Sequence, residues 1–339
     1  MGISIAKVAP ALKDEWDEVW KLCDYATYFH SSEWASIWSV YTNGEFVAAP
    51  KMILFSDDKK AVVPLSLQKG FKRWPKTFWS SPAGTFGGWI SKDNLTMDHT
   101  MLLVSYMRKL GDVVWRTNPY DELLSNVVVE GLRTDVTDVL DLKDGFEAIY
   151  KGWPKWHRKA ANQARRKGVV IRLANSLGDW KEYYGVYKDS LRRWSDTASS
   201  RYEFRIFEEM QRRNSPNIKL WLAVYQEKII AGALCFYAKK HAAGWHAASL
   251  EKYFRLRPNN LIQYEAIRDA CERGFSWYDF NPSGGHEGVR AFKKSFGTQA
   301  YPSNVLIKHS LAFRTMNTVM NGFGFMKHRL SFLNMRKLA

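Results

Sequence analysis

The feature that most constrains the fold of this chain is a strand, a glycine-rich turn and a short helix that follow one another close to its end, at residues 278–297. The strand is predicted at residues 275–280, and the helix after the turn carries Phe292, Lys293 and Phe296. Gly284 and Gly285 remove side chains from the end of the strand, so that a ligand can approach the backbone closely. Lys293 is therefore expected beside that opening.

Length and composition favour a globular protein with an anionic partner. A chain of 339 residues has room for two domains, and a hydrophobic content of 46% supports buried cores. The net charge of +16 indicates a nucleic acid, a phosphorylated substrate or an anionic membrane surface as partner. Cys23, Cys235 and Cys271 have neither metal-site nor disulfide-framework spacing, so we expect no metal and a reducing cytoplasm.

The predicted elements follow the same plan in both halves of the chain. In the first half they are helices at residues 12–23, 32–40 and 96–110, and strands at 47–55, 60–68, 113–117 and 125–132. In the second half they are helices at residues 180–193, 202–213 and 260–273, and strands at 219–226, 228–239, 243–249 and 275–280. This similarity of pattern predicts two copies of one α/β unit.

Two basic segments lie outside that plan. A helix is predicted at residues 154–168, where Pro154 opens it and the final glycine ends it. Arg158 and Arg165 share one face of this helix, so we expect them to contact the phosphates of a polyanion. The tail at residues 311–339 is basic and apolar, and it is expected to dock on the protein or, alternatively, on a membrane.

Short motifs along nearly the whole chain resemble one known family. In the first half they are Phe29-His30-Ser31-Ser32-Glu33-Trp34, Val63-Pro64-Leu65, Ser80-Ser81-Pro82 and Gly87-Gly88. In the second half they are Ala164-Arg165-Arg166-Lys167-Gly168-Val169, Ile229-Ile230-Ala231-Gly232-Ala233, Trp245-His246-Ala247-Ala248-Ser249, Tyr278-Asp279-Phe280 and Phe292-Lys293-Lys294-Ser295-Phe296-Gly297. Their order and spacing resemble the Fem-type acyltransferases, a branch of the GNAT-like acyltransferases that includes enzymes transferring amino acids from aminoacyl-tRNA to peptidoglycan precursors.

The resemblance implies an α/β (α+β) fold class. We expect two tandem GNAT-like domains, each a mixed, mostly antiparallel sheet flanked by helices. The expected domains are residues 1–165 and residues 166–310, with the transfer site in the second and a tail at 311–339.

The resemblance also implies roles for individual residues. Phe292 and Lys293 match a Phe-Lys pair in the family's transfer site, where the lysine stabilises charge on the acyl donor. Arg201 matches a substrate-binding arginine that holds a phosphate. The remaining expected substrate contacts are Trp245, His246, Asp279, Gly284 and Gly285.

Two departures from the family bear on the substrates. Ser36 follows Trp34-Ala35 where the peptidoglycan branch has a lysine that holds a sugar nucleotide, so that acceptor is in doubt. Residues 255–260 contain Pro258 and no glycine where coenzyme-A-dependent relatives cradle pyrophosphate, which weakens acyl-CoA as the donor.

We therefore predict an acyltransferase that forms an amide on an amine of a cell-envelope or peptide precursor. Its donor would be aminoacyl-tRNA, with acyl-CoA as the alternative, and no cofactor would be tightly bound. A coenzyme-A-dependent N-acyltransferase acting on a polysaccharide or lipid precursor stays open, as does a non-catalytic module that binds RNA or membrane. The expected location is cytoplasmic, with peripheral contact at the inner face of the membrane left open, and no obligate protein partner is inferred.

Overall fold

The computed structural model describes residues 2–69, 76–195, 198, 201–284, 286–311 and 313–315. It divides into two compact units, of which the first comprises Met1–Val136 and Pro302–Ala339 and the second comprises Thr137–Tyr301. Across the described residues, no helix is both long and apolar enough to cross a membrane.

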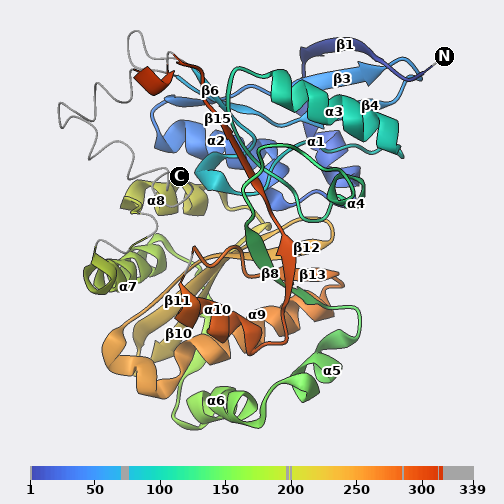
Figure 1. The fold of residues 1–339 in the computed structure, drawn as a ribbon. Helices are drawn as coiled ribbons and strands as arrows, with labels where there is room; N and C mark the ends of the chain where they lie inside the picture. The colour runs from blue at the N-terminus through green and yellow to red at the C-terminus, as the bar shows by residue number, and fades with distance from the viewer. Residues whose placement is uncertain are drawn as a thin grey trace. The chain divides into compact units, whose positions relative to one another are not determined.

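In the described residues, the first unit contains two sheets with helices packed around them (Figure 1). The three-stranded sheet has the order β1 (Ile5–Pro10), β3 (Lys51–Phe55), β4 (Lys60–Val63). The five-stranded sheet has the order β15 (Val305–Lys308), β7 (Asp112–Arg116), β6 (Thr77–Trp79), β5 (Ser66–Gln68), β2 (Phe46–Ala48). The helices are α1 (Lys13–Leu22), α2 (Ser32–Tyr41), α3 (Met97–Lys109) and α4 (Glu122–Ser125).

Two strand predictions in this unit were too long, and one was wrong. The strand predicted at residues 47–55 is split into β2 and β3 around Pro50, and the one at 60–68 into β4 and β5 around Pro64. Proline has no N–H to donate to a ladder, so each proline marks the point where the chain leaves one sheet for the other. Residues 125–132 form no strand; their first residue ends α4 and the rest continue as turns and irregular backbone.

The second unit is built on one seven-stranded sheet. Its order is β14 (Gln299–Pro302), β8 (Val136–Asp141), β13 (Trp277–Asp279), β12 (His241–Ser249), β11 (Lys228–Tyr237), β10 (Ile218–Tyr225), β9 (Val170–Leu173). Its helices are α5 (Gly145–Gly152), α6 (Lys155–Arg166), α7 (Leu177–Trp194), α8 (Phe204–Arg213), η4 (Glu251–Leu256), α9 (Pro258–Glu272) and α10 (Glu287–Lys294).

Helices cover both faces of this sheet. On one face, alternate residues of β11 share a core with buried residues of α6 and α9 (Figure 1). On the other face α7 lies so close to β11 that a Cβ on Gly232 would stand 2.6 Å from the ring of Tyr183. Glycine is needed at this position because no other side chain fits beneath that ring.

Among the strand pairs whose registers are known in the described residues, one in each unit is parallel and joined through a helix, and the others are antiparallel. The pair is β6–β7 with α3 between them in the first unit, and β12–β13 with α9 between them in the second. The predicted fold class, a mixed and mostly antiparallel sheet with flanking helices in each of two units, is confirmed.

The boundaries between the units lie at residues 136/137 and 301/302, and the expected boundaries were 165/166 and 310/311. Residues 137–165 belong to the second unit because β8 pairs with β13, and α6 packs into the core shared with α9. Residues 302–310 belong to the first unit because β15 pairs with β7. Most of the expected tail, residues 316–339 together with residue 312, lies outside the described residues.

Candidate functional site

Lys293 and Asp279, two of the predicted site residues, lie where the parallel strands β12 and β13 part. The two strands pair at three positions, the last of them Ala243 with Asp279. Immediately beyond, the side chain of Asn281 donates a 2.8 Å hydrogen bond to the carbonyl of Gly244. Asn281 has a φ of +58°, a left-handed conformation that asparagine tolerates better than most residues. The chain therefore turns sharply away from the sheet at this point.

Lys293 is directed into this turn from α10. Its side chain is almost buried, at 6% exposure, and its ammonium donates a hydrogen bond to the carbonyl oxygen of Asn281. The same ammonium lies 3.9 Å from a carboxylate oxygen of Asp138, which is itself 2% exposed. Lys294, the next residue, is exposed. The helix thus presents one lysine to the interior and the other to solvent.

A group of buried polar side chains on β8 and after β13 supports that turn. Asp279 is fully buried; it accepts hydrogen bonds from the hydroxyl of Thr137 and, at 2.6 Å, from the backbone N–H of Asn281. The hydroxyl of Ser283 donates to Asp138 at 3.0 Å. Asp279 thereby holds the turn in place, while Asp138 supplies the counter-charge to the buried ammonium.

Asp138, Asn281 and Ser283 were missed by reasoning from the sequence. A Thr-Asp pair at residues 137–138 carries no family motif. The available signal was the short run of Val, Thr and Leu at residues 136–142, a composition typical of a strand, which would have predicted β8.

The second group of predicted residues lies on β12 and in the segment just before α8. The rings of Trp245 and Tyr202 are stacked, with centroids 5.0 Å apart and an interplanar angle of 28°. Arg201 immediately precedes Tyr202, is exposed, and donates to the carbonyl oxygen of Ser195. The structure therefore places Arg201 beside the strand that carries Trp245, two residues before the N-cap residue of α8, Glu203.

His246 is enclosed by aromatic rings. Its ring centroid lies 4.4 Å from that of Tyr187 and 5.3 Å from that of Phe207, and its Nδ1 shares a 2.7 Å hydrogen bond with the hydroxyl of Tyr183. Burial lowers the pKa of His246 to about 3, so the ring is neutral at physiological pH. This enclosure favours packing and orientation of β12 over proton transfer.

The side chain of Phe292 packs on the side of α10 that faces the hydrophobic core, and not in the polar turn. Its ring packs edge-on against Phe296, with centroids 5.1 Å apart, and 6.3 Å from His157. Burial lowers the pKa of His157 to about 4. The contacts of Phe292 fix α10 on the body, which in turn directs Lys293; a role in catalysis stays a prediction.

The two glycines of the turn and the two arginines of α6 complete the predicted set. Gly284 is exposed and has a φ of +58°, whereas Gly285 lies outside the described residues. Arg165 is ion-paired with Glu265 at 2.6 Å and stacks over Tyr264. Arg158 donates to the carbonyl oxygen of Lys151 at 3.2 Å. Both arginines are thus engaged within the protein, and the structure does not gather them with the β12–β13 turn.

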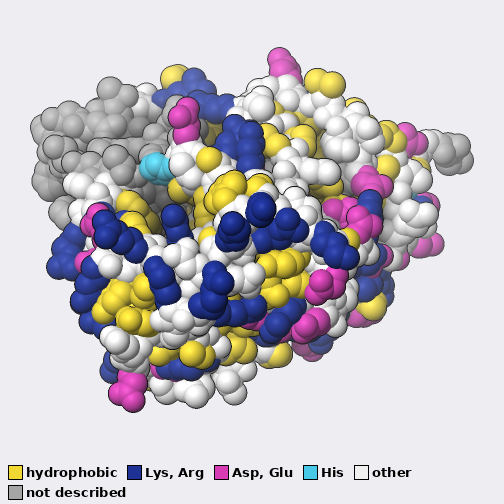
Figure 2. Space-filling model, turned by 90° about the horizontal axis from the view of Figure 1, so that it is seen from below, with side chains coloured by type: hydrophobic (Ala, Val, Ile, Leu, Met, Phe, Trp, Pro, Cys, Tyr) yellow, Lys and Arg dark blue, Asp and Glu magenta, His cyan; other side chains and the backbone are white. Residues whose placement is uncertain are grey.

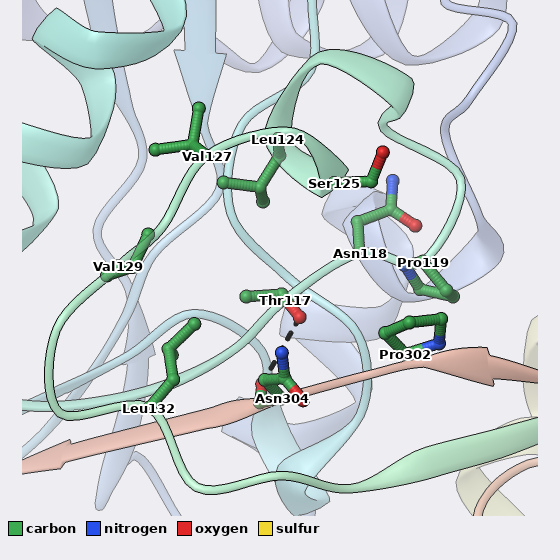
Figure 3. A pocket seen from close by; sticks show the side chains of 10 residues that line it. All are labelled: Thr117, Asn118, Pro119, Leu124, Ser125, Val127, Val129, Leu132, Pro302 and Asn304. Atoms are coloured by element: carbon green, nitrogen blue, oxygen red, sulfur yellow. Dashed lines mark hydrogen bonds between the residues drawn. The ribbon is translucent and has the colours of Figure 1, made fainter.

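A separate small hollow of about 70 Å³ lies in the first unit. Figure 3 shows apolar side chains from α4 and the segment after it on one side, and the polar residues Thr117 and Asn304 on the other. The hydroxyl of Thr117 donates to the carbonyl oxygen of Asn304 at 3.3 Å. None of the residues predicted as site residues lines this hollow. Its lining comprises Thr117, Asn118, Pro119, Leu124, Ser125, Val127, Val129, Leu132, Pro302 and Asn304.

A family model matches most of the second unit. Residues 155–294 match the family model described as an acetyltransferase (GNAT) domain, a stretch that includes α6 to α10. This stretch of the chain is similar to a GNAT domain. No curated protein matches the chain.

Solved structures extend the likeness over nearly the whole chain. FemX matches with a TM-score of 0.69 and 14% identity, covering 93% of this chain and 99% of that one. A conserved protein of unknown function from Bacteroides thetaiotaomicron VPI-5482 matches with a TM-score of 0.55 and 10% identity, covering 89% and 98%. The C-terminal domain of a putative lysylphosphatidylglycerol synthetase from Agrobacterium fabrum matches with a TM-score of 0.52 and 13% identity, covering 80% and 88%.

At these identities the structures establish the fold, and the family model establishes the class of domain. The expected Fem-type, GNAT-like fold and the expected enzyme class, an acyltransferase, are confirmed on these grounds. The donor, the acceptor and the roles of individual residues stay predictions.

Proposed function

We propose that the protein forms an amide by transferring an aminoacyl group from aminoacyl-tRNA to an amine of a cell-envelope or peptide precursor. The observation that carries the proposal is the placement of Lys293, a buried ammonium at the parting of β12 and β13, inside the GNAT acyltransferase domain. The net charge of +16 supports a polyanionic donor. Two of the similar structures are FemX and a domain of a putative lysylphosphatidylglycerol synthetase, whose name denotes an aminoacylated lipid.

The reaction needs few groups from the protein. The acceptor nitrogen attacks the ester carbonyl, a C–N bond forms, the C–O bond to the ribose breaks, and the proton from nitrogen ends on the released hydroxyl. Negative charge develops on the carbonyl oxygen during the attack. An ammonium already desolvated and held in place stabilises that charge without reorganisation, which is the role we assign to Lys293. Stacked Trp245 and Tyr202, with Arg201 next to them, would position the substrates.

Acyl-CoA is the second candidate donor. The description of the matching family as an acetyltransferase favours it, and Arg255 and Arg257 are exposed just before α9, where they could meet phosphates. Against it, α9 begins at Pro258, which has no N–H to offer a pyrophosphate.

Supplying the two kinds of donor in separate assays tests the proposal. The purified protein is given a mixture of charged tRNAs or a panel of acyl-CoA thioesters, together with a lipid extract and a water-soluble extract of cell envelope as acceptors, and products are identified by mass gain. We expect aminoacylated product only with charged tRNA. If product formed only with acyl-CoA, the donor would be acyl-CoA, the second candidate. Binding of tRNA without turnover of either donor would indicate a non-catalytic module.

Paired lysine variants test the site in the same assay. Lys293→Met should lower turnover by about 100- to 1000-fold, the usual cost of losing one oxyanion donor. Lys294→Met removes the same charge from the neighbouring, exposed position and should leave turnover near that of the wild type. Equal effects of the two substitutions would refute the role assigned to Lys293.

A further inference from the structure

Helix α6 presents an outer row of residues that is distinct from the row expected to bind a polyanion. His157, Ala160, Ala161 and Ala164 are buried, so this side of the helix faces the protein. The exposed residues on the other side recur at helical spacing. Arg165 is exposed as well, but it is paired with Glu265. We term the other exposed residues the outer α6 face: Lys155, Trp156, Lys159, Asn162 and Arg166.

The outer α6 face is strongly basic. The helix contains five Lys and Arg residues and no Asp or Glu. Arg165 is 38% exposed, but its charge is offset by the ion pair with Glu265, and the half-buried Arg158 donates to the carbonyl oxygen of Lys151. Lys155, Lys159 and Arg166 supply the basic charge of the outer row, most of it from lysines. Figure 2, which views the second unit from the side where α6 lies in Figure 1, shows many Lys and Arg side chains and few acidic ones across the middle of that face.

An exposed tryptophan stands among these charges. Trp156 is 63% exposed, although its ring contacts His157 edge-on with centroids 5.2 Å apart. Most of the indole therefore lies open to water between Lys155 and Lys159. Indole rings are favoured at the headgroup level of a membrane, where an apolar ring and a polar N–H both find suitable surroundings.

We propose that the outer α6 face docks on the surface of an anionic lipid membrane. Lysines with a single indole on one helical row match a charged, interfacial surface, with the ammonium groups at the headgroups and the ring between them. The two arginines expected to suit bidentate contacts with nucleic-acid phosphates already have partners in the protein: Arg165, although 38% exposed, is paired with Glu265, and Arg158 donates to the carbonyl oxygen of Lys151. This proposal stands apart from the proposed reaction and holds whichever donor the enzyme uses.

Vesicle sedimentation with the full chain tests the proposal. The vesicles contain phosphatidylcholine alone, or phosphatidylcholine with a third of the lipid replaced by phosphatidylglycerol. The charge variant is Lys155→Gln/Lys159→Gln/Arg166→Gln, and Trp156→Ala is prepared separately. The matched control, Lys21→Gln/Lys109→Gln/Lys228→Gln, removes three charges from exposed lysines on α1, α3 and β11. Melting curves and circular dichroism verify that each variant is folded.

The wild type should bind the anionic vesicles, bind neutral ones weakly, and lose affinity as salt rises. The charge variant should bind about 100-fold more weakly, since each basic residue near an anionic surface contributes about fivefold. Trp156→Ala should weaken binding at every salt concentration, and the control variant should behave as the wild type.

Three results would overturn the proposal. The first is equal binding to neutral and anionic vesicles. The second is an equal loss of binding in the charge variant and the control variant. The third is a result with bulk uncharged tRNA in which Trp156→Ala binds the tRNA more weakly than the wild type does, while both proteins bind anionic vesicles equally well. The outer α6 face would then bind nucleic acid instead of a membrane.

Discussion

Replacing Lys293 by methionine should destabilise the second unit as well as slow the reaction. From the sequence alone this substitution is expected to fold normally, because methionine keeps most of the alkyl volume. The structure gives another expectation. The ammonium lies 3.9 Å from the carboxylate of Asp138, both side chains are almost fully buried, and the ammonium also donates to the carbonyl of Asn281. Its removal leaves a buried carboxylate without its counter-charge.

The expected loss can be worked from that geometry. Two unit charges 3.9 Å apart attract by about 4 kcal/mol at an effective dielectric constant of about 20. Removing one partner of a buried pair typically costs about 3 to 5 kcal/mol, because the remaining charge stays desolvated. Asp138 keeps its hydrogen bond from Ser283, which offsets part of the loss. We therefore expect Lys293→Met to lower the free energy of unfolding by about 3 kcal/mol. The melting temperature should fall by about 2 to 4 °C for each kcal/mol lost.

A double-mutant cycle separates this effect from catalysis. Lys293→Met, Asp138→Asn and the double variant are compared by thermal and denaturant unfolding and by turnover. The double variant should be more stable than the sum of the single effects predicts, by at least about 1 kcal/mol, since it leaves no unpaired buried charge. Its turnover should stay as low as that of Lys293→Met. Additive stabilities would show that the two charges do not interact, and recovery of turnover in the double variant would show that Lys293 acts only through folding.

Two further predictions concern packing and pH. Gly232→Ala should lower the free energy of unfolding by about 1 to 3 kcal/mol, because the added Cβ would stand 2.6 Å from the ring of Tyr183. Gly185→Ala on α7 adds a Cβ that meets no atom within 4 Å, and it should stabilise the protein by up to about 1 kcal/mol. Equal shifts in the melting temperatures of the two variants would contradict this account. Burial lowers the pKa of His246 to about 3, so between pH 6.5 and 3 the unfolded chain binds a proton that the folded chain does not. Wild-type stability should therefore fall with decreasing pH by about 1.4 kcal/mol per unit more than that of His246→Gln, and parallel pH profiles of unfolding would refute the assignment.

Much of the local structure could be predicted from the sequence. The apolar periodicity predicted α1, α2, α7, α9 and the hairpin of β10 and β11 close to their observed bounds. The helical spacing of residues 292–296 likewise implied that Lys293 and Lys294 point in different directions, and one is buried while the other is exposed. These features depend on neighbours a few residues apart, which is the range over which side-chain periodicity carries information.

The tertiary structure alone decided which residues are partners. Nothing near Arg165 in the chain indicates Glu265, 100 residues away, yet that pair offsets the charge of the arginine, while Lys155 and Lys159 lie on the outer α6 face. In the same way β15, near the end of the chain, pairs with β7 and moves the boundary between the units. The motifs of the sequence determined the fold class and the place of Lys293 on its helix. The counter-charge of Lys293 and the exposed row of α6 follow from long-range pairing, because a buried charge or an exposed face is defined only once distant segments have packed together.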